Sequence, residues 1–304
     1  MVFSKNGKRN ICNSYRLQIS FLRIRRYYYN LKSLVIHNGA FLYLVAMKRI
    51  AFILLLCLQS AASQSYVKTN QSPLSVSQFI GYDSYDSMYT ITDMVLRKEN
   101  TSGVFLFTDF QLGNITSVDI INPFNVVVFY ADTNTTVLLD NKLSLIEQIN
   151  FNLLADVANI SSVSNAGGNK LWLFNADSQQ LELYNYRNNT KNSISLPIAE
   201  ILTDQTSDFN YNYILTPNAV KVYTVFGGLV KSIPFQGGQK IITYKGRVLV
   251  VKDGVIYEII ENSLKLLSIK TTQISIQDLQ VFEDFLYIYD RKNVHSFVVQ
   301  KPKK

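Results

Sequence analysis

The stretch Lys170–Asn189, KLWLFNADSQQLELYNYRNN, contains two short alternations of apolar and polar residues. The first alternation covers residues 171–174 and the second covers residues 181–184. Residues 175–178 (NADS) lie between them and are of types that bend a chain. Two alternating runs around such a turn predict a β-hairpin.

Related hairpins recur along the rest of the chain. Their tips are Asp132, Asp177, Asn218, Asp253 and Asp290, at spacings of 45, 41, 35 and 37 residues. Each tip separates two runs rich in Val, Ile, Leu, Tyr and Phe, and most of these hairpins have another candidate strand before and after them. Helical periodicity is nearly absent. The pattern predicts an all-β chain of repeated four-stranded antiparallel units.

The repeat resembles that of a β-propeller, in which each blade is a four-stranded meander and the blades surround an axis. About six such units fit the chain after its leader. The last unit ends after Val299 without a fourth strand, whereas residues 74–82 (LSVSQFIGY) offer an unpaired one. We therefore expect an N-terminal strand to close the last blade and remove an open sheet edge. A pair of β-sandwiches or a solenoid is the alternative fold.

The resemblance to β-propellers is one of pattern. Trp172 is followed by Leu173, so no Trp-Asp dipeptide ends a blade, and no kelch pattern repeats. At this level the chain is similar to diverged, secreted β-propeller repeat proteins of the bacterial type.

The charge is distributed unevenly along the 304 residues. The formal charge is +8, but ten of the 30 basic residues and none of the 22 acidic residues lie in residues 1–49. The remaining chain carries 20 basic and 22 acidic side chains, a net charge of −2. Long-range capture of a polyanion is therefore not expected of the body, and we predict no nucleic-acid partner.

The leader divides at Met47. Residues 1–46 have the composition of neither a domain nor an ordinary targeting sequence, and we interpret them as a leader of doubtful translation. Residues 47–63 have two basic residues, an apolar run at Ile50–Leu58 and small residues after it, which predicts a secretory signal peptide cut between Ser63 and Gln64. The propeller domain would then be residues 64–304. A retained membrane anchor is the alternative, although the apolar run is shorter than the roughly 20 residues of a membrane span.

Both cysteines, Cys12 and Cys57, lie in the leader, so the processed chain would have no thiol and no disulfide. The residue before Cys57 is Leu56 rather than a small one, which argues against a lipoprotein signal. A thiol-free chain suits an oxidising envelope compartment.

Catalytic and metal-binding patterns are weak. The aspartates at the hairpin tips lack the alternating oxygen ligands of a calcium loop, and Asp residues at a tip commonly bond to their own backbone. His295 is the only histidine of the body, too few for a His-based hydrolase or a His-rich metal centre. The close carboxylate pairs are Asp83 with Asp86 and Asp204 with Asp208. We predict no catalytic residue, cofactor or metal.

Tyrosines are abundant in the body. Tyr211 and Tyr213, flanked by Asn210 and Asn212 in a stretch that reads as a loop, are the best candidates for a binding surface.

These observations predict an exported, monomeric propeller that binds a protein or carbohydrate at one face of the ring, in the cell envelope or outside the cell. The alternatives are a carbohydrate-active hydrolase with two carboxylates and a membrane-tethered envelope assembly factor. The step from fold to role is an analogy.

Overall fold

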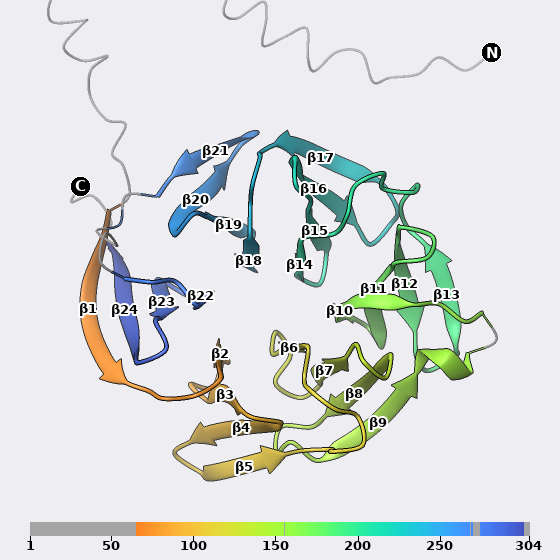
Figure 1. Ribbon diagram of the computed structural model, residues 1–304, viewed down its shortest axis with the longest axis horizontal. Coiled ribbons are helices and arrows are strands. Elements are labelled where there is room, and N and C mark those ends of the chain that lie inside the picture. Colours follow the sequence, from red (N-terminus) through yellow and green to blue (C-terminus); the bar gives the residue numbers. More distant parts are fainter. Residues whose placement is uncertain (1–64, 155, 268, 270–273, 301–304) are drawn as a thin grey trace, which may run out of the picture. The chain divides into compact units, whose positions relative to one another are not determined.

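The computed structural model of the protein describes residues 65–154, 156–267, 269 and 274–300. These residues form six four-stranded antiparallel sheets, arranged around an axis as the blades of a β-propeller (Figure 1). In this part of the chain, helix is limited to the 3₁₀ turn η1 (Phe151–Leu153). The prediction of an all-β propeller with six four-stranded blades is confirmed, and the sandwich and solenoid alternatives are wrong.

Blades 1 to 3 follow one another in sequence, each with its first strand nearest the axis (Figure 1). Their strands are β2 (Gln78–Tyr82), β3 (Met88–Thr92), β4 (Val95–Asn100), β5 (Gly103–Phe107), β6 (Ser117–Asp119), β7 (Val126–Tyr130), β8 (Thr135–Leu139), β9 (Leu145–Asn150), β10 (Ile160–Gly167), β11 (Lys170–Asn175), β12 (Gln180–Asn185) and β13 (Thr190–Ser193).

Blades 4 to 6 continue the ring, and blade 6 takes its outer strand from the start of the described chain. Their strands are β14 (Asp204–Ser207), β15 (Tyr211–Leu215), β16 (Ala219–Thr224), β17 (Leu229–Pro234), β18 (Lys240–Tyr244), β19 (Arg247–Lys252), β20 (Val255–Ile260), β21 (Ser263–Leu266), β22 (Asp278–Phe282), β23 (Phe285–Tyr289), β24 (Asn293–Gln300) and β1 (Ser65–Pro73).

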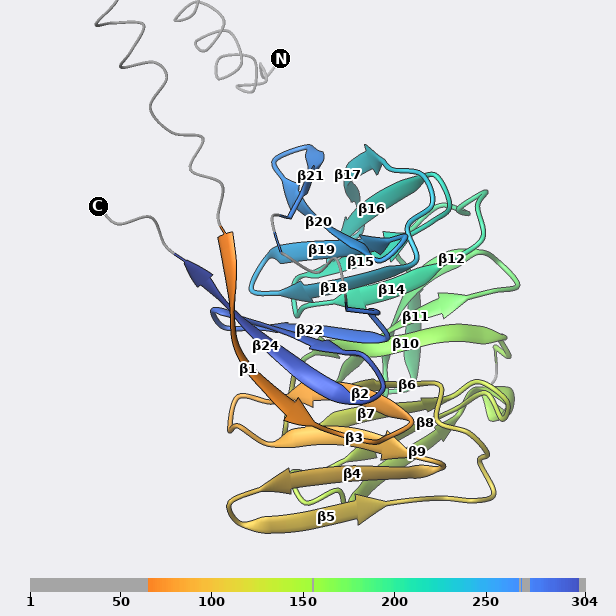
Figure 2. The ribbon, with the colours of Figure 1, turned by 60° about the vertical axis from the view of Figure 1, so that its left-hand side comes forward.

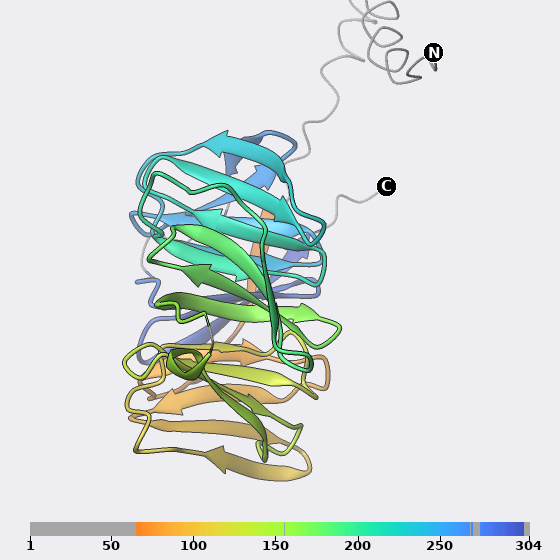
Figure 3. The same ribbon diagram turned by 90° about the vertical axis from the view of Figure 1, so that its right-hand side faces the viewer.

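The middle strands are apolar on both faces because each blade is covered by a neighbour on either side. Strand β7, VVVFY, is buried at every position. Val127 and Phe129 pack against blade 3, whereas Val126, Val128 and Tyr130 pack against blade 1. The other four interfaces between blades have apolar clusters of their own. The ring is therefore held by six separate cores rather than by one. Figure 3 shows the stacked sheets of the ring edge-on.

Strand β1 closes the ring. It runs antiparallel to β24, with a register from Ser65 opposite Gln300 to Pro73 opposite Asn293, and Figure 2 shows the two strands side by side. The expected closure by an N-terminal strand is confirmed, but residues 74–82 are the wrong segment. β2 occupies residues 78–82 as the innermost strand of blade 1. The closing strand, SYVKTNQSP, lies at the outer edge and is mostly polar, so its sequence lacks the alternation of a buried strand.

The five hairpins predicted from the repeat are present, with their tips between the second and third strands of blades 2 to 6. One strand is missing from the prediction. Strand β14, DQTS, is the innermost strand of blade 4 and has no apolar residue, and it was not predicted.

The ring has two faces, which we name by the connections they carry. The hairpin face carries the turns between the first and second strands of each blade and those between the third and fourth strands. The crossover face carries the turns between the second and third strands and the connections from one blade to the next. Strand β1 begins at the hairpin face, because Ser65 lies opposite the last residue of β24.

Candidate functional site

Two aromatic side chains from neighbouring blades meet on the hairpin face. Tyr85 comes from the turn between β2 and β3, and Phe124 from the turn between β6 and β7. Their ring centroids are 5.6 Å apart in an edge-to-face arrangement, yet Tyr85 is 60% exposed and Phe124 55% exposed. Large aromatic groups that pair with each other at the surface leave ring area available to a ligand.

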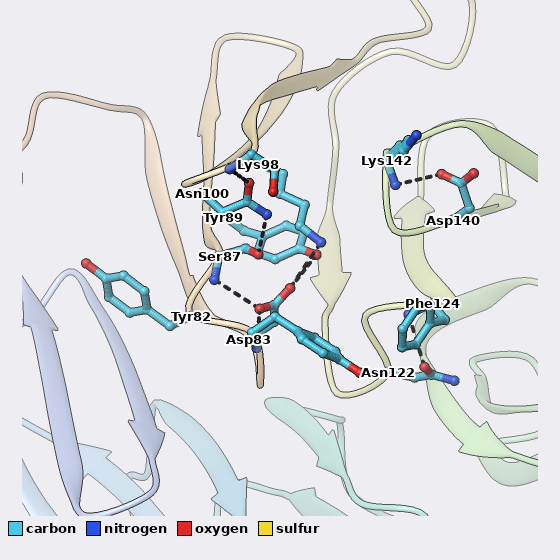
Figure 4. Close-up of polar contacts among 12 residues, drawn as sticks. Tyr82, Asp83, Ser87, Tyr89, Lys98, Asn100, Asn122, Phe124, Asp140 and Lys142 are labelled. Atoms are coloured by element: carbon cyan, nitrogen blue, oxygen red, sulfur yellow. Dashed lines mark hydrogen bonds and ion pairs between the residues drawn. The ribbon is translucent and has the colours of Figure 1, made fainter.

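A buried ion pair supports the turn that carries Tyr85 (Figure 4). One carboxylate oxygen of Asp83 accepts hydrogen bonds from the backbone N–H groups of Tyr85 and Ser87, at 2.8 and 3.0 Å. The other accepts from the Tyr89 hydroxyl at 3.0 Å and lies 3.1 Å from the Lys98 ammonium. The side chains of Asp83 and Lys98 are 0% and 3% exposed. This buried network of hydrogen bonds and charges thus holds the turn in one conformation.

Burial and hydrogen bonding act in opposite directions on Asp83. Burial by itself would raise the pKa of its carboxyl, but the N–H groups of Ser87 and Tyr85 and the ammonium of Lys98 outweigh it and hold the pKa below its ordinary value. Burial, together with the nearby Asp83 carboxylate, raises the pKa of the Tyr89 hydroxyl. The pair is therefore an ionised structural support, with Tyr89 as a neutral donor.

A pocket of about 470 Å³ opens on the same face, between blades 2, 3 and 4. Its volume lies within the range of small-ligand pockets. It is lined by Asn122, Ala166, Gly167, Gly168, Lys170, Phe209 and Val225.

The wall of this pocket depends on a glycine. Gly167 has a φ of +69°, and a Cβ at this position would lie 3.1 Å from the ring of Phe209. A glycine therefore allows both the left-handed backbone and the close approach of the ring. The lining has one cation, Lys170, one amide, Asn122, and no acidic side chain. The rest of the lining is apolar or backbone.

Phe226 extends this surface. It lies in the turn between β16 and β17 and is 94% exposed. The neighbouring N–H of Val225, a pocket residue, donates to the carbonyl of Asn210. We call Tyr85, Phe124, Phe209 and Phe226 the aromatic arc; they come from turns of blades 1, 2 and 4 on the hairpin face, and Phe209 lines the pocket. Phe124, Phe209 and Phe226 were not predicted from the sequence as binding residues. Phe226 stands directly before Gly227-Gly228, and a large aromatic residue in such a turn was the available signal.

The two tyrosines selected from the sequence lie on strand β15 rather than in a loop. Tyr211 is at the surface, 38% exposed. Tyr213 is 5% exposed and its hydroxyl lies 3.3 Å from a carboxylate oxygen of Asp208, so the expected surface position is wrong for Tyr213. The two tyrosines lie on the same side of β15, two positions apart. Tyr211 begins the strand at its exposed end, whereas Tyr213 lies further along it, in the interface between blades 4 and 5.

Neither candidate carboxylate pair has a catalytic arrangement. Asp83 is bound to Lys98, while Asp86 is exposed in the turn. Asp204 begins β14 and Asp208 follows its last residue, so they lie at opposite ends of a strand about 13 Å long. Asp204 instead accepts the N–H of Ile241 in the next blade at 2.7 Å.

The aspartates at the turns between the second and third strands lie on the crossover face. The carboxylate of Asp177 accepts the N–H of Asn159 at 2.9 Å, and that of Asp290 accepts the N–H groups of Lys292 and Asn293. Among the described residues, no three or more His, Cys, Asp or Glu side chains are grouped so that they could hold a metal ion.

His295 lies on β24 and is 4% exposed. Its Nε2 is 2.7 Å from a carboxylate oxygen of Asp290. Burial alone would raise the pKa of Asp290, but the hydrogen bond with His295 and the N–H groups of Lys292 and Asn293 lower it to about 2. The pair joins the start of β24 to the turn before it, so its geometry is that of a structural contact.

The predicted cleavage residues Ser63 and Gln64, the leader and both cysteines lie outside the described residues. Across the part of the chain that is described, no helix combines the length and the apolar character of a membrane span.

Comparison with known proteins supports the fold. No protein-family model matches the sequence, and no curated protein matches it. Among solved structures, virginiamycin B lyase from Staphylococcus aureus is 9% identical with a TM-score of 0.53 over 78% of this chain and 99% of the lyase. The WD40 domain of Toxoplasma gondii coronin is 10% identical with a TM-score of 0.54, over 80% of this chain and 87% of that one.

The extracellular domain of BT4673 from B. thetaiotaomicron is 11% identical with a TM-score of 0.50, over 75% of this chain and 40% of that one. These proteins have different roles, one a lyase and another an extracellular domain. At such identities the similarity shows the β-propeller fold alone. No family match places the chain among secreted bacterial repeat proteins, so that part of the resemblance stays a prediction.

Proposed function

We propose that the protein is an exported binding module whose hairpin face holds a segment of a partner protein. The observation that carries the proposal is the aromatic arc on the same face as the pocket, with Phe209 in the pocket wall. Aromatic side chains are enriched at protein interfaces and supply much of their binding energy. A pocket beside them can receive one anchoring side chain of the partner, with Lys170 and Asn122 available for its polar groups.

The hydrolase alternative requires two carboxylates about 5–10 Å from each other in one pocket. Asp83 is neutralised by Lys98, and Asp204 and Asp208 lie at opposite ends of β14. The wall of the pocket also contains no acidic side chain. The geometry therefore favours binding over glycoside hydrolysis.

The proposed export rests on the signal peptide predicted at residues 47–63. A cut between Ser63 and Gln64 would leave every described strand in the mature protein, because β1 begins at Ser65. N-terminal sequencing of the protein from its natural source should therefore begin at Gln64. A mature chain that keeps residues 47–63 and fractionates with the membrane would contradict cleavage and favour the tethered assembly factor.

The binding proposal is tested by crosslinking the tagged, exported chain in cells and identifying what it holds. The test variant is Tyr85→Ala/Phe226→Ala, which removes two exposed rings from the aromatic arc. The matched control is Leu106→Ala, a residue 61% exposed on the outer strand β5. We expect the natural chain and the control to capture one discrete protein partner. The double variant should capture at least about tenfold less of that partner.

Recovery of the chain alone would contradict the proposal, as would a partner captured equally by all three forms. If a saccharide were the ligand, oligosaccharide arrays would bind the natural chain and no protein would be captured. That result would replace the proposed partner class.

A further inference from the structure

The crossover face has an exposed apolar surface of its own. It lies on three consecutive connections between blades, residues 108–116, 151–159 and 194–203. We call this surface the apolar arc. Its members are Phe110, 72% exposed, Leu153, 83%, Val157, 62%, Leu196, 85%, and Ile201, 77%.

These side chains are not needed to cover the core. The same three connections contain other apolar residues that are buried, including Leu112, Phe151 and Ile198, at 6%, 1% and 4% exposure. In the described parts of the other three connections, residues 74–77, 235–239 and 267–277, no large apolar side chain is strongly exposed. Exposed apolar residues that gather on one part of a surface are characteristic of interaction sites.

The segments that carry and adjoin the apolar arc have an excess of acidic residues. The three connections, together with the turns at residues 131–134 and 176–179 between them, contain five acidic residues and no Lys or Arg. Two of the acids have cationic partners on neighbouring strands: Asp156 with Lys191 at 2.8 Å, and Glu200 with Lys221 at 3.8 Å. Asp132 and Asp177 are exposed at the surface. All three connections and both turns therefore contribute carboxylates to this side of the ring, of which those of Asp156 and Glu200 are paired with lysines.

We propose that the apolar arc docks a basic, amphipathic segment of a partner polypeptide. Its apolar side would cover the five exposed side chains, and its Lys and Arg residues would meet the surrounding carboxylates. An anionic membrane is a poorer occupant, because its headgroups would face Asp132 and Asp177 with the same sign of charge. A second copy of the chain is poorer for the same reason, since a two-fold contact would place the same acidic residues opposite one another.

This inference is independent of the proposed function. The apolar arc and the aromatic arc lie on opposite faces of the ring, and neither uses residues of the other. If both bind, the propeller connects two proteins.

The test uses the full chain, expressed with its leader and purified after export. The probe is a synthetic 18-residue helix with leucine on one side and lysine on the other, and a peptide with glutamate in place of lysine is its control. We expect the lysine peptide to bind at least about tenfold more tightly than the glutamate peptide, and to weaken as salt rises.

Variants locate the contact on the surface. Leu153→Ser/Leu196→Ser removes two side chains that are more than four-fifths exposed, and Asp132→Lys/Asp177→Lys reverses two surface charges. Each is expected to lower the affinity for the lysine peptide at least about tenfold. The matched controls are Leu106→Ser on β5 and Asp253→Lys at the equivalent tip of blade 5, which should leave the affinity unchanged.

Equal binding of the two peptides would overturn the proposal, as would an affinity that neither arc variant changes. Binding of the natural chain to phosphatidylglycerol vesicles, lost in the leucine variant, would identify a lipid surface instead. Self-association in sedimentation, lost in the same variant, would identify a second copy instead.

Discussion

At the scale of single residues, substitutions in the ion pair buried in blade 1 should have a large effect on the free energy of unfolding. The carboxylate of Asp83 and the ammonium of Lys98 are both removed from solvent and are 3.1 Å apart. The same carboxylate holds the N–H groups of the turn that presents Tyr85. A buried ion pair stabilises a fold little more than two apolar side chains of similar volume would. Removal of one partner, however, leaves the other as an uncompensated buried charge.

Lys98→Met should therefore lower the free energy of unfolding by about 3–5 kcal/mol. Arg97→Met is the matched control, because Arg97 pairs with Glu99 at the surface and such pairs contribute about 0–1 kcal/mol. Urea denaturation measures both. The double variant Asp83→Asn/Lys98→Met should recover part of the loss. Equal stability of Lys98→Met and Arg97→Met would show that the pair is not buried.

Asp290 provides a pH-dependent prediction. Its pKa of about 2 in the folded chain lies below the ordinary value of 3.8, so its contribution to stability is present above pH 4 and is lost as the pH falls toward 2. Carbon-detected NMR of labelled aspartate should show one carboxyl that titrates near 2. In the His295→Asn variant, the pKa of Asp290 should rise toward its ordinary value. A titration of Asp290 near 4 in the natural chain would contradict the contact with His295.

At the scale of elements, the closing strand β1 is held by one buried side chain and by its backbone pairing with β24. Tyr66 is 6% exposed and packs in the interface between blades 5 and 6 with Leu249 and Leu279. Its hydroxyl bonds to Arg247, whose guanidinium also lies 5.7 Å from the Tyr66 ring centroid. The neighbouring Val67 is 42% exposed. Attachment of the first strand to the ring thus depends on an aromatic anchor and on the backbone ladder with β24.

Tyr66→Ala should lower the free energy of unfolding by about 3–5 kcal/mol, because it removes a buried aromatic side chain. Tyr66→Phe should cost about 1–2 kcal/mol, since it removes only the hydrogen bond to Arg247. Val67→Ala, one residue away and exposed, should cost less than about 1 kcal/mol. Chemical denaturation of the three variants measures the order of these losses in the free energy of unfolding. A larger loss for Val67→Ala than for Tyr66→Ala would mean that β1 pairs in another register.

At the scale of the whole molecule, the sequence predicts the repeat well and the surfaces poorly. The hairpins could be predicted because each depends on residues close to one another in the sequence, as in residues 170–189. Strand β14, DQTS, could not be predicted, because it has no apolar residue to alternate with its polar ones. The pocket and the aromatic arc were not predictable, since they join residues from different blades. Gly167 and Phe209, for example, meet only when blades 3 and 4 stack.

Closure of the ring is the claim on which both proposed surfaces depend, and one disulfide tests it directly. Val67 on β1 lies opposite Val298 on β24, as an antiparallel pair within reach of a disulfide. Residues 64–304 contain no other cysteine. On oxidation, V67C/V298C should form the crosslink in high yield, identified by peptide mass spectrometry, and gain about 2–4 kcal/mol in stability. If V67C/V298C stays reduced while V76C/V298C forms the bond, residues 74–82 close the last blade and this account of the ring is wrong.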